Sequence, residues 1–207
     1  MERVERLQYI TQGTTPHSIE HEVRSVLEGG CRWVQLRMKD AQQDTIIEIG
    51  RRIKSICHSY GAKLIINDSV EICKSVDADG VHLGKCDMQT EKARALLGPE
   101  KIIGRTCNTA EDVLSTIDTA IDYIGLGPLK FTTTKKHLSP IIGLEGYGKI
   151  ISDTKATIPI VAVGGITLED ISPLLGQGVY GVALSGTIAK SENISNTTRN
   201  ILNIINR

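Results

Sequence analysis

Eight short apolar runs rich in β-branched residues recur along this chain, and their spacing constrains its fold more than any other feature. Because each run is apolar along nearly its whole length, it is typical of a strand buried on both faces, as in a parallel sheet. The predicted strands are Leu7–Thr11, Trp33–Arg37, Lys63–Asn67, Gly80–Leu83, Lys101–Thr106, Tyr123–Leu126, Pro159–Val163 and Gly181–Leu184.

Segments compatible with helices lie between these runs. The longest is Asp44–Tyr60, in which isoleucines recur with helical periodicity. The others are Ser18–Leu27, which begins near the cap candidates Thr15 and Ser18, a short Val70–Ser75, Met88–Leu97, Ala110–Ile117, Gly143–Ser152, Leu168–Leu175 and the tail after Ser191.

This alternation predicts a single (β/α)8 TIM barrel with parallel strands. Eight βα units in 207 residues average about 26 residues each, which suits a compact barrel. An open, doubly wound parallel sheet is the alternative, since periodicity alone does not separate the two architectures. The chain shows no low-complexity linker, so we expect residues 1–207 to form one domain that carries the whole site.

The charge balance and the cysteines restrict the function classes. The 24 Lys and Arg residues balance the 24 Asp and Glu residues, which disfavours binding to nucleic acid or to a membrane. The chain has no signal-peptide-like start and no apolar stretch of membrane-span length. Five scattered cysteines favour unpaired thiols in the cytoplasm over disulfides or a zinc cluster. Any anion site must therefore come from local groups.

The second predicted strand carries the strongest polar signal. Catalytic groups of a TIM barrel lie at the C-terminal ends of its strands, and Gln35, Arg37 and Lys39 alternate onto one side there. Two cations and an amide on one face predict a phosphate-binding clamp. A solvated edge face is the alternative, and it is disfavoured because a buried strand does not carry inward charges without a partner.

Two carboxylates follow the next two strands. Asp68 directly follows the third strand, and Asp87 lies just past the fourth. Beside a phosphate clamp, such a pair suggests Mg²⁺, which is often held by one or two carboxylates plus substrate phosphates. For Asp87, an N-cap of a helix that begins near Met88 is an equally good interpretation. His82 lies in mid-strand and is interpreted as a hydrogen-bonded core histidine without a chemical role.

Two further segments carry donors for phosphate. The loop after the sixth strand, Gly127–Lys136, holds three threonines and three lysines, although a Thr-rich surface loop would look the same. The seventh strand ends near Gly165 and the eighth at Leu184 and Ser185, the places where TIM barrels recurrently bind phosphate. The spacing thus predicts two anion sites, one for a metal-bound pyrophosphate and one for a monophosphate.

With these motifs in order, the chain resembles the thiamine-phosphate synthase family over nearly its whole length. The matching segments are Tyr9-Ile10-Thr11, Gln35–Lys39, Asn67-Asp68, Ala78–Gly84 followed by Asp87, Gly127-Pro128 with Thr132–Lys135, Gly164-Gly165-Ile166, and Leu184-Ser185. Each segment alone is a weak signal, but their order and intervals together are highly specific.

The resemblance implies a reaction and a set of site residues. A hydroxymethylpyrimidine diphosphate is joined to a hydroxyethylthiazole phosphate, and pyrophosphate leaves first in a dissociative mechanism. The pyrimidine diphosphate is then expected at Gln35, Leu36, Arg37, Met38, Lys39, Asn67, Thr106 and Lys135, with Arg37, Lys39 and Lys135 catalytic. Mg²⁺ is expected at Asp68 and Asp87, and the thiazole phosphate at Thr132, Thr133, Thr134, Gly165, Leu184 and Ser185.

Some positions depart from the family pattern. Met38 replaces a common Glu, Thr106 replaces the usual Ser but keeps its hydroxyl, Lys85 replaces a common Gln, and Lys130-Phe131 replaces an aromatic-Pro pair. Lys85 and Lys130 are expected to add positive charge near the mouth of the barrel.

Two other functions compete with the synthase. A related thiazole tautomerase would have no use for a diphosphate–Mg²⁺ site, so the clamp and the two carboxylates favour the synthase. A non-catalytic thiamine-phosphate-binding barrel is the second rival, because a fold does not fix a function. In each case the partners are small molecules, and the sequence leaves open whether the chain forms a homodimer.

Overall fold

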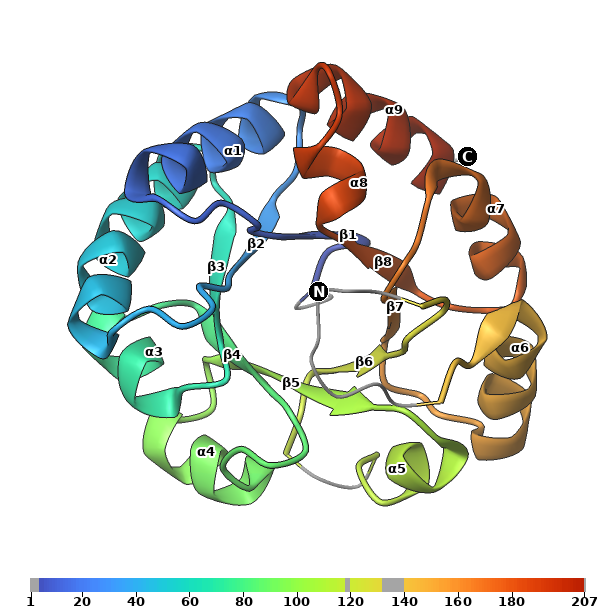
Figure 1. Ribbon diagram of the computed structural model, residues 1–207. Coiled ribbons are helices and arrows are strands. Elements are labelled where there is room, and N and C mark those ends of the chain that lie inside the picture. Colours follow the sequence, from blue (N-terminus) through green and yellow to red (C-terminus); the bar gives the residue numbers. More distant parts are fainter. Residues whose placement is uncertain (1–3, 118–119, 132–139, 207) are drawn as a thin grey trace.

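The computed structural model, which describes residues 4–117, 120–131 and 140–206, is a closed barrel of eight parallel strands inside a ring of helices (Figure 1). The strands are β1 (Leu7–Ile10), β2 (Trp33–Leu36), β3 (Lys63–Asn67), β4 (Gly80–Leu83), β5 (Ile102–Cys107), β6 (Tyr123–Leu126), β7 (Ile160–Val163) and β8 (Gly181–Leu184). The helices are α1 (Pro16–Glu28), α2 (Gln43–Ser59), α3 (Val70–Val76), α4 (Thr90–Leu97), α5 (Ala110–Leu114), α6 (Gly143–Thr154), α7 (Leu168–Gly176), α8 (Gly186–Ala189) and α9 (Ile194–Ile205).

Closure of the sheet confirms the predicted TIM barrel and excludes the open, doubly wound sheet. β1 pairs in parallel with β8, with Leu7 opposite Val182 and Tyr9 opposite Leu184. Every other strand pairs with its neighbours in chain order. Within the described residues, no helix combines the length and apolar character needed to cross a membrane.

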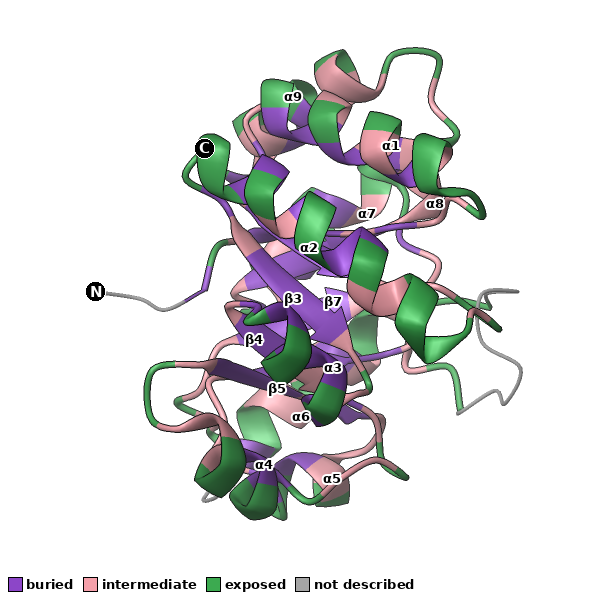
Figure 2. Ribbon diagram, turned by 90° about the vertical axis from the view of Figure 1, so that its left-hand side faces the viewer, coloured by how far each residue is buried: buried purple, intermediate pink, exposed green. Residues whose placement is uncertain are grey.

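The core has two layers, one on each side of the barrel wall. Outward-facing strand residues pack against the helices, so that the strands are buried on both faces (Figure 2). Inside the barrel, Trp33 and Tyr123 meet edge to face with ring centroids 4.7 Å apart. They belong to a small apolar cluster that fills the barrel: Val4, Trp33, Ile65, Ile102, Tyr123, Val161 and Ala183. This cluster packs the interior of the barrel with side chains, as is usual in this fold.

Local sequence explains where most helices begin. Thr15 caps α1 in a capping box with Ser18, and Ser69 caps α3 by accepting a bond from Ile72 N. The helix predicted for the tail after Ser191 is confirmed as α9, whereas the short α8 that directly follows β8 was not predicted and lies inside the ring of the other helices in Figure 1. The chain breaks there and restarts at α9, where the Asn193 side chain accepts from Asn196 N.

Candidate active site

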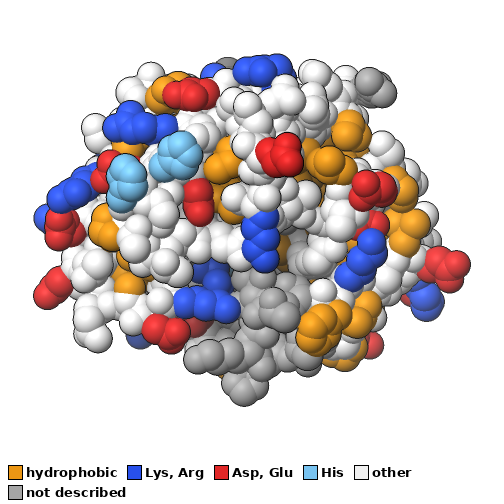
Figure 3. Space-filling model, turned by 45° about the horizontal axis from the view of Figure 1, so that its top comes forward, with side chains coloured by type: hydrophobic (Ala, Val, Ile, Leu, Met, Phe, Trp, Pro, Cys, Tyr) orange, Lys and Arg blue, Asp and Glu red, His pale blue; other side chains and the backbone are white. Residues whose placement is uncertain are grey.

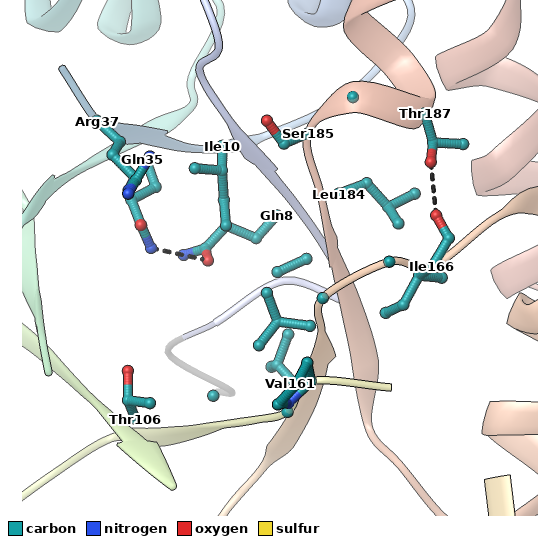
Figure 4. A pocket seen from close by; sticks show the side chains of 18 of the residues that line it. Gln8, Ile10, Gln35, Arg37, Thr106, Val161, Ile166, Leu184, Ser185 and Thr187 are labelled. Atoms are coloured by element: carbon teal, nitrogen blue, oxygen red, sulfur yellow. Dashed lines mark hydrogen bonds between the residues drawn. The ribbon is translucent and has the colours of Figure 1, made fainter. Parts of the chain in front are cut away.

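A cavity of about 390 Å³ opens at the C-terminal ends of the strands, and every strand contributes to its wall. Polar side chains also line it from positions within the strands: Gln8, Gln35, His82, Thr106 and Tyr123. Figure 4 shows several of these side chains converging on the cavity. On the face drawn in Figure 3, basic and acidic side chains are interspersed, so selection among anions depends on particular groups.

The predicted clamp on β2 is brought to the cavity only in part. Gln35 and Arg37 line the cavity, whereas Lys39 lies beyond the end of the strand and is exposed. Burial lowers the pKa of Arg37, and the nearby carboxylates of Asp68 and Asp40 oppose that shift. Thr11 holds the Arg37 backbone from both sides, since its hydroxyl donates to Arg37 O at 3.0 Å and accepts from Arg37 N at 2.9 Å.

The residues that alternate with this clamp face away from the cavity. Leu36 is buried in the layer between the barrel and the helices, and Met38 packs against that layer. Of these two positions, only the backbone is therefore suited to contact a ligand in the cavity.

Asp68 and Asp87 lie side by side at the mouth. Both carboxylates approach Gly84, because a Cβ atom built there would lie 3.0 Å from Asp87 Oδ2 and 4.0 Å from Asp68 Oδ1. The Gly84 N–H donates to Asp87 Oδ2 at 2.6 Å. The pKa of Asp68 rises to about 6, because burial disfavours its charge and because Asp87 lies beside it, while Arg37 and Asn67 oppose the rise.

The alternative interpretation of Asp87 as a helix N-cap is wrong. α4 begins at Thr90 and its N-cap is Gln89, two residues after Asp87. The Asp87 carboxylate instead closes a tight turn back to Gly84, and this turn carries it toward Asp68.

The donor set of this carboxylate pair suits Mg²⁺. A divalent cation between Asp68 and Asp87 would remove their mutual repulsion, and Mg²⁺ commonly takes its remaining ligands from substrate phosphates and water. In the described part of the chain, no group of three or more His, Cys, Asp or Glu residues could hold a metal ion. The pair therefore fits a metal that arrives with a phosphate-bearing substrate better than a permanently caged one.

The other side of the cavity is lined by the ends of β7 and β8. Gly164 and Gly165 have φ angles of 95° and 70°, a region that favours glycine. A Cβ atom at Gly165 would also lie 3.0 Å from the carbonyl oxygens of Lys130 and Phe131. Across from them, the buried Ser185 Oγ has no hydrogen-bond partner among the described residues (Figure 4), which leaves this hydroxyl available to a ligand.

The structure adds residues that the sequence did not single out. Gln12, Thr187 and Lys190 line the cavity near Ser185, and Gln12 Oε1 is also buried without a partner in the described chain. Glu22 holds the loop that carries Gln12, since its carboxylate accepts from Gln12 N at 3.1 Å and from Tyr9 Oη at 2.8 Å. Gln8 also lines the cavity, and it had a recognisable sequence signal, because it is a glutamine inside an otherwise apolar strand.

The expected extra charge at the mouth is neutralised. Lys130 Nζ lies 2.7 Å from Asp170 Oδ1, and Lys85 pairs with Asp112. Each lysine thus has a carboxylate partner that the sequence had not connected to it. Four predicted site residues lie outside the described part of the chain: Thr132, Thr133, Thr134 and Lys135.

Comparison with known proteins identifies the relatives of this chain. The family model described as thiamine monophosphate synthase matches residues 7–188. Thiamine-phosphate synthase from Phocaeicola vulgatus is 50% identical over 201 residues, covering 96% of this chain and 97% of the relative. The counterpart from Bacteroides thetaiotaomicron is 48% identical, with 96% of each chain covered. The solved thiamine phosphate pyrophosphorylase from Pyrococcus furiosus superposes with a TM-score of 0.85 at 32% identity, covering 97% of this chain and 95% of that one.

Proposed function

This chain belongs to the thiamine monophosphate synthase family, and from that premise we propose how its cavity serves the two substrates of the reaction. The enzyme is a thiamine-phosphate synthase, a transferase of thiamine biosynthesis. In the reaction, the thiazole nitrogen of a hydroxyethylthiazole phosphate forms a C–N bond to the pyrimidine methylene carbon. The C–O bond to the diphosphate breaks, and pyrophosphate leaves with the bonding electrons.

The diphosphate is assigned to the mouth beside β2, β3 and β4. Arg37 lines the cavity there and Lys39 lies just beyond it, so both cations can approach phosphate oxygens. Asp68 and Asp87 would hold Mg²⁺, which when bound neutralises charge on the leaving diphosphate. The juxtaposition of these two carboxylates near Arg37 is the observation that carries the proposal.

The thiazole phosphate is assigned to the opposite side. Gly165 offers backbone without a side chain, Leu184 shapes the wall, and Ser185 offers a hydroxyl that no other described residue binds. A neutral hydroxyl and close backbone are suited to a monophosphate that needs no metal. Thr132, Thr133 and Thr134 are proposed to complete this half.

Charge that develops on the leaving pyrophosphate must be stabilised as the C–O bond breaks. We assign this role to Arg37, Lys39 and Lys135, since preorganised cations act most strongly where charge accumulates. The pyrimidine ring is assigned to Gln35, Asn67 and Thr106, which line the cavity closer to the barrel interior. Contacts from Leu36 and Met38 would use their backbone atoms.

A turnover assay with both substrates tests the proposal. The expected product is thiamine phosphate, formed together with one equivalent of pyrophosphate in the presence of Mg²⁺. A thiazole tautomerase would convert a thiazole carboxylate phosphate without the pyrimidine diphosphate. A non-catalytic binder would bind thiamine phosphate without turning over either substrate. Either of the last two results would overturn the assignment.

A further inference from the structure

A chain of hydrogen bonds runs through the barrel interior from β2 to β5 by way of β1, β6 and β4. Gln35 Nε2 donates to Gln8 Oε1 at 3.1 Å, and Gln8 Nε2 donates to Tyr123 Oη at 3.2 Å. Tyr123 Oη lies 2.9 Å from His82 Nδ1, and His82 Nε2 lies 2.9 Å from Thr106 Oγ1. The Gln8, Gln35 and Tyr123 side chains are almost completely buried, so the network is shielded from bulk water.

The hydroxyl of Tyr123 decides in which direction the hydrogen bonds of this network run. Its three polar neighbours are Gln8, Gln35 and His82. Burial raises the pKa of Tyr123, and hydrogen bonds from the amides of Gln8 and Gln35 oppose that rise. A phenol accepts two hydrogen bonds but donates only one. With both glutamines donating, the single phenolic proton goes to His82 and all three contacts are made.

The reverse direction leaves a contact unmade. If both amides presented oxygen to Tyr123 and His82 donated to it, one phenolic proton would face two amide oxygens. One almost completely buried oxygen would then lack a donor from the protein, which costs free energy. The forward direction is therefore the one that satisfies the network.

From this order, we infer that Tyr123 and His82 are positioning residues that turn the Thr106 hydroxyl into an obligatory hydrogen-bond donor to the bound substrate. His82 accepts at Nδ1, so its proton resides on Nε2 and is donated to Thr106 Oγ1. Having accepted from His82, the Thr106 hydroxyl has its own proton left for the cavity that it lines. Figure 4 shows this side chain projecting into the cavity from β5.

The partner of this proton is an uncharged ring nitrogen. The charged groups at the mouth follow the ends of the strands, whereas Thr106 and its supporting chain lie within them, among uncharged polar side chains. An acceptor at that depth is a lone pair of a heteroaromatic ring and not a diphosphate oxygen. This inference rests on the proposed function, because it assigns the pyrimidine ring to this part of the cavity.

A double-mutant cycle on the full-length enzyme tests the inference. Thr106→Val and Tyr123→Phe are each expected to raise KM for the pyrimidine diphosphate about tenfold, the scale of one hydrogen bond, while KM for the thiazole phosphate stays unchanged. In the Thr106→Val background, Tyr123→Phe should add less than about twofold, because its effect passes through Thr106. Thr106→Ser keeps the hydroxyl and should restore most of the affinity for the pyrimidine diphosphate that Thr106→Val loses.

Two controls separate ring recognition from diphosphate binding and from misfolding. The affinity for inorganic pyrophosphate with Mg²⁺ should be unchanged in Thr106→Val and in Tyr123→Phe. An analogue with carbon in place of the ring nitrogen should bind wild type and Thr106→Val equally. Additive effects in the cycle, or an equal loss for inorganic pyrophosphate, would overturn the inference.

The tautomer of His82 is measurable in the wild-type protein without any variant. Nitrogen NMR is expected to show an unprotonated Nδ1 and a protonated Nε2, and Tyr123→Phe should release that preference. A protonated Nδ1 in wild type contradicts the inference even if turnover is normal. Absence of turnover with the expected tautomer would instead contradict the proposed function, so the two failures are distinguishable.

Discussion

Asp68 at the mouth of the barrel differs in its surroundings from two carboxylates at the opposite end. At the N-terminal ends of the strands, Asp122 pairs with Arg94 at 2.6 Å and accepts from Ile103 N at 2.8 Å. Asp77 pairs there with Lys54 at 2.5 Å and Lys101 at 2.6 Å. At the mouth, Asp68 faces a second carboxylate. One end has matched charges that stabilise the fold, whereas the other retains a repulsion that a bound cation would relieve.

The pKa values express this contrast for the same residue type. Hydrogen bonds and charge from the two lysines lower the pKa of Asp77 to about 2. Burial and the neighbouring carboxylate raise the pKa of Asp68 to about 6. Perturbations of the second kind cluster at functional sites, because a like-charge pair is retained where a ligand compensates it.

Of the changes that test this contrast, metal removal should have the largest effect on turnover. In excess EDTA, turnover is expected to fall to background, because the carboxylates would repel the diphosphate once no cation lies between them. Added Mg²⁺ should restore it. The measurement is steady-state thiamine phosphate formation, and full activity in EDTA would rule out the metal assignment.

Removing one carboxylate from the mouth should have the next largest effect. Asp68→Ala is expected to lower turnover at least tenfold, the loss of about 1.4 kcal/mol of transition-state stabilisation. Asp77→Ala is the matched control at the opposite end and should leave kcat unchanged. Equal losses in the two variants would show that the two ends do not differ in function.

Breaking a matched pair should reduce stability without altering chemistry. The Asp122 side chain is only 9% exposed and holds both Arg94 and a backbone N–H, so Asp122→Ala is expected to lower the free energy of unfolding by about 1.5–3 kcal/mol. Asp77 is 72% exposed, and Asp77→Ala should cost less than about 1 kcal/mol. Urea unfolding measures both, and a larger loss for Asp77→Ala would contradict the importance given to burial.

The smallest expected effect is a gain in stability at the mouth. Because the folded-state pKa of Asp68 lies above its unfolded value, Asp68 favours folding at low pH, and this contribution is lost as pH rises through about 6. In metal-free protein at pH 8, Asp68→Asn should therefore be more stable than wild type by about 1 kcal/mol, after allowing for solvent screening. Asparagine also tolerates the positive φ of this position.

The pH dependence of that gain is its internal control. Thermal unfolding in EDTA should show the difference between Asp68→Asn and wild type shrinking as pH falls through about 6, and vanishing below about 4, where Asp68 is protonated in both states. A gain that persists at low pH would have a cause other than charge repulsion.

Much of the fold was predictable because its signals are local. Strands buried on both faces read as apolar runs, and four of the predicted ranges agree with the structure at both ends: Lys63–Asn67, Gly80–Leu83, Tyr123–Leu126 and Gly181–Leu184. The short α8 was not predicted, because a helix of four residues is too short to show a helical periodicity of its own.

The candidate site was less completely predictable. Alternation along β2 placed Gln35 and Arg37 at the cavity, but it did not indicate that Lys39 would be exposed outside the cavity wall. The ion pairs of Lys85 with Asp112 and of Lys130 with Asp170 join residues that no local pattern relates, so the sequence did not indicate that the charge of these lysines is paired.

The sequence by itself determined the alternation of strands and helices, the identity of the polar groups at the strand ends, and the family. The tertiary structure alone decided that the sheet closes, that Asp87 turns toward Asp68 instead of capping α4, and that Tyr123 lies between His82 and Gln8. Gln8 and Tyr123 are separated by 115 positions. Periodicity reports the face on which a residue lies, but only the closure and stagger of the barrel set which residues meet across it.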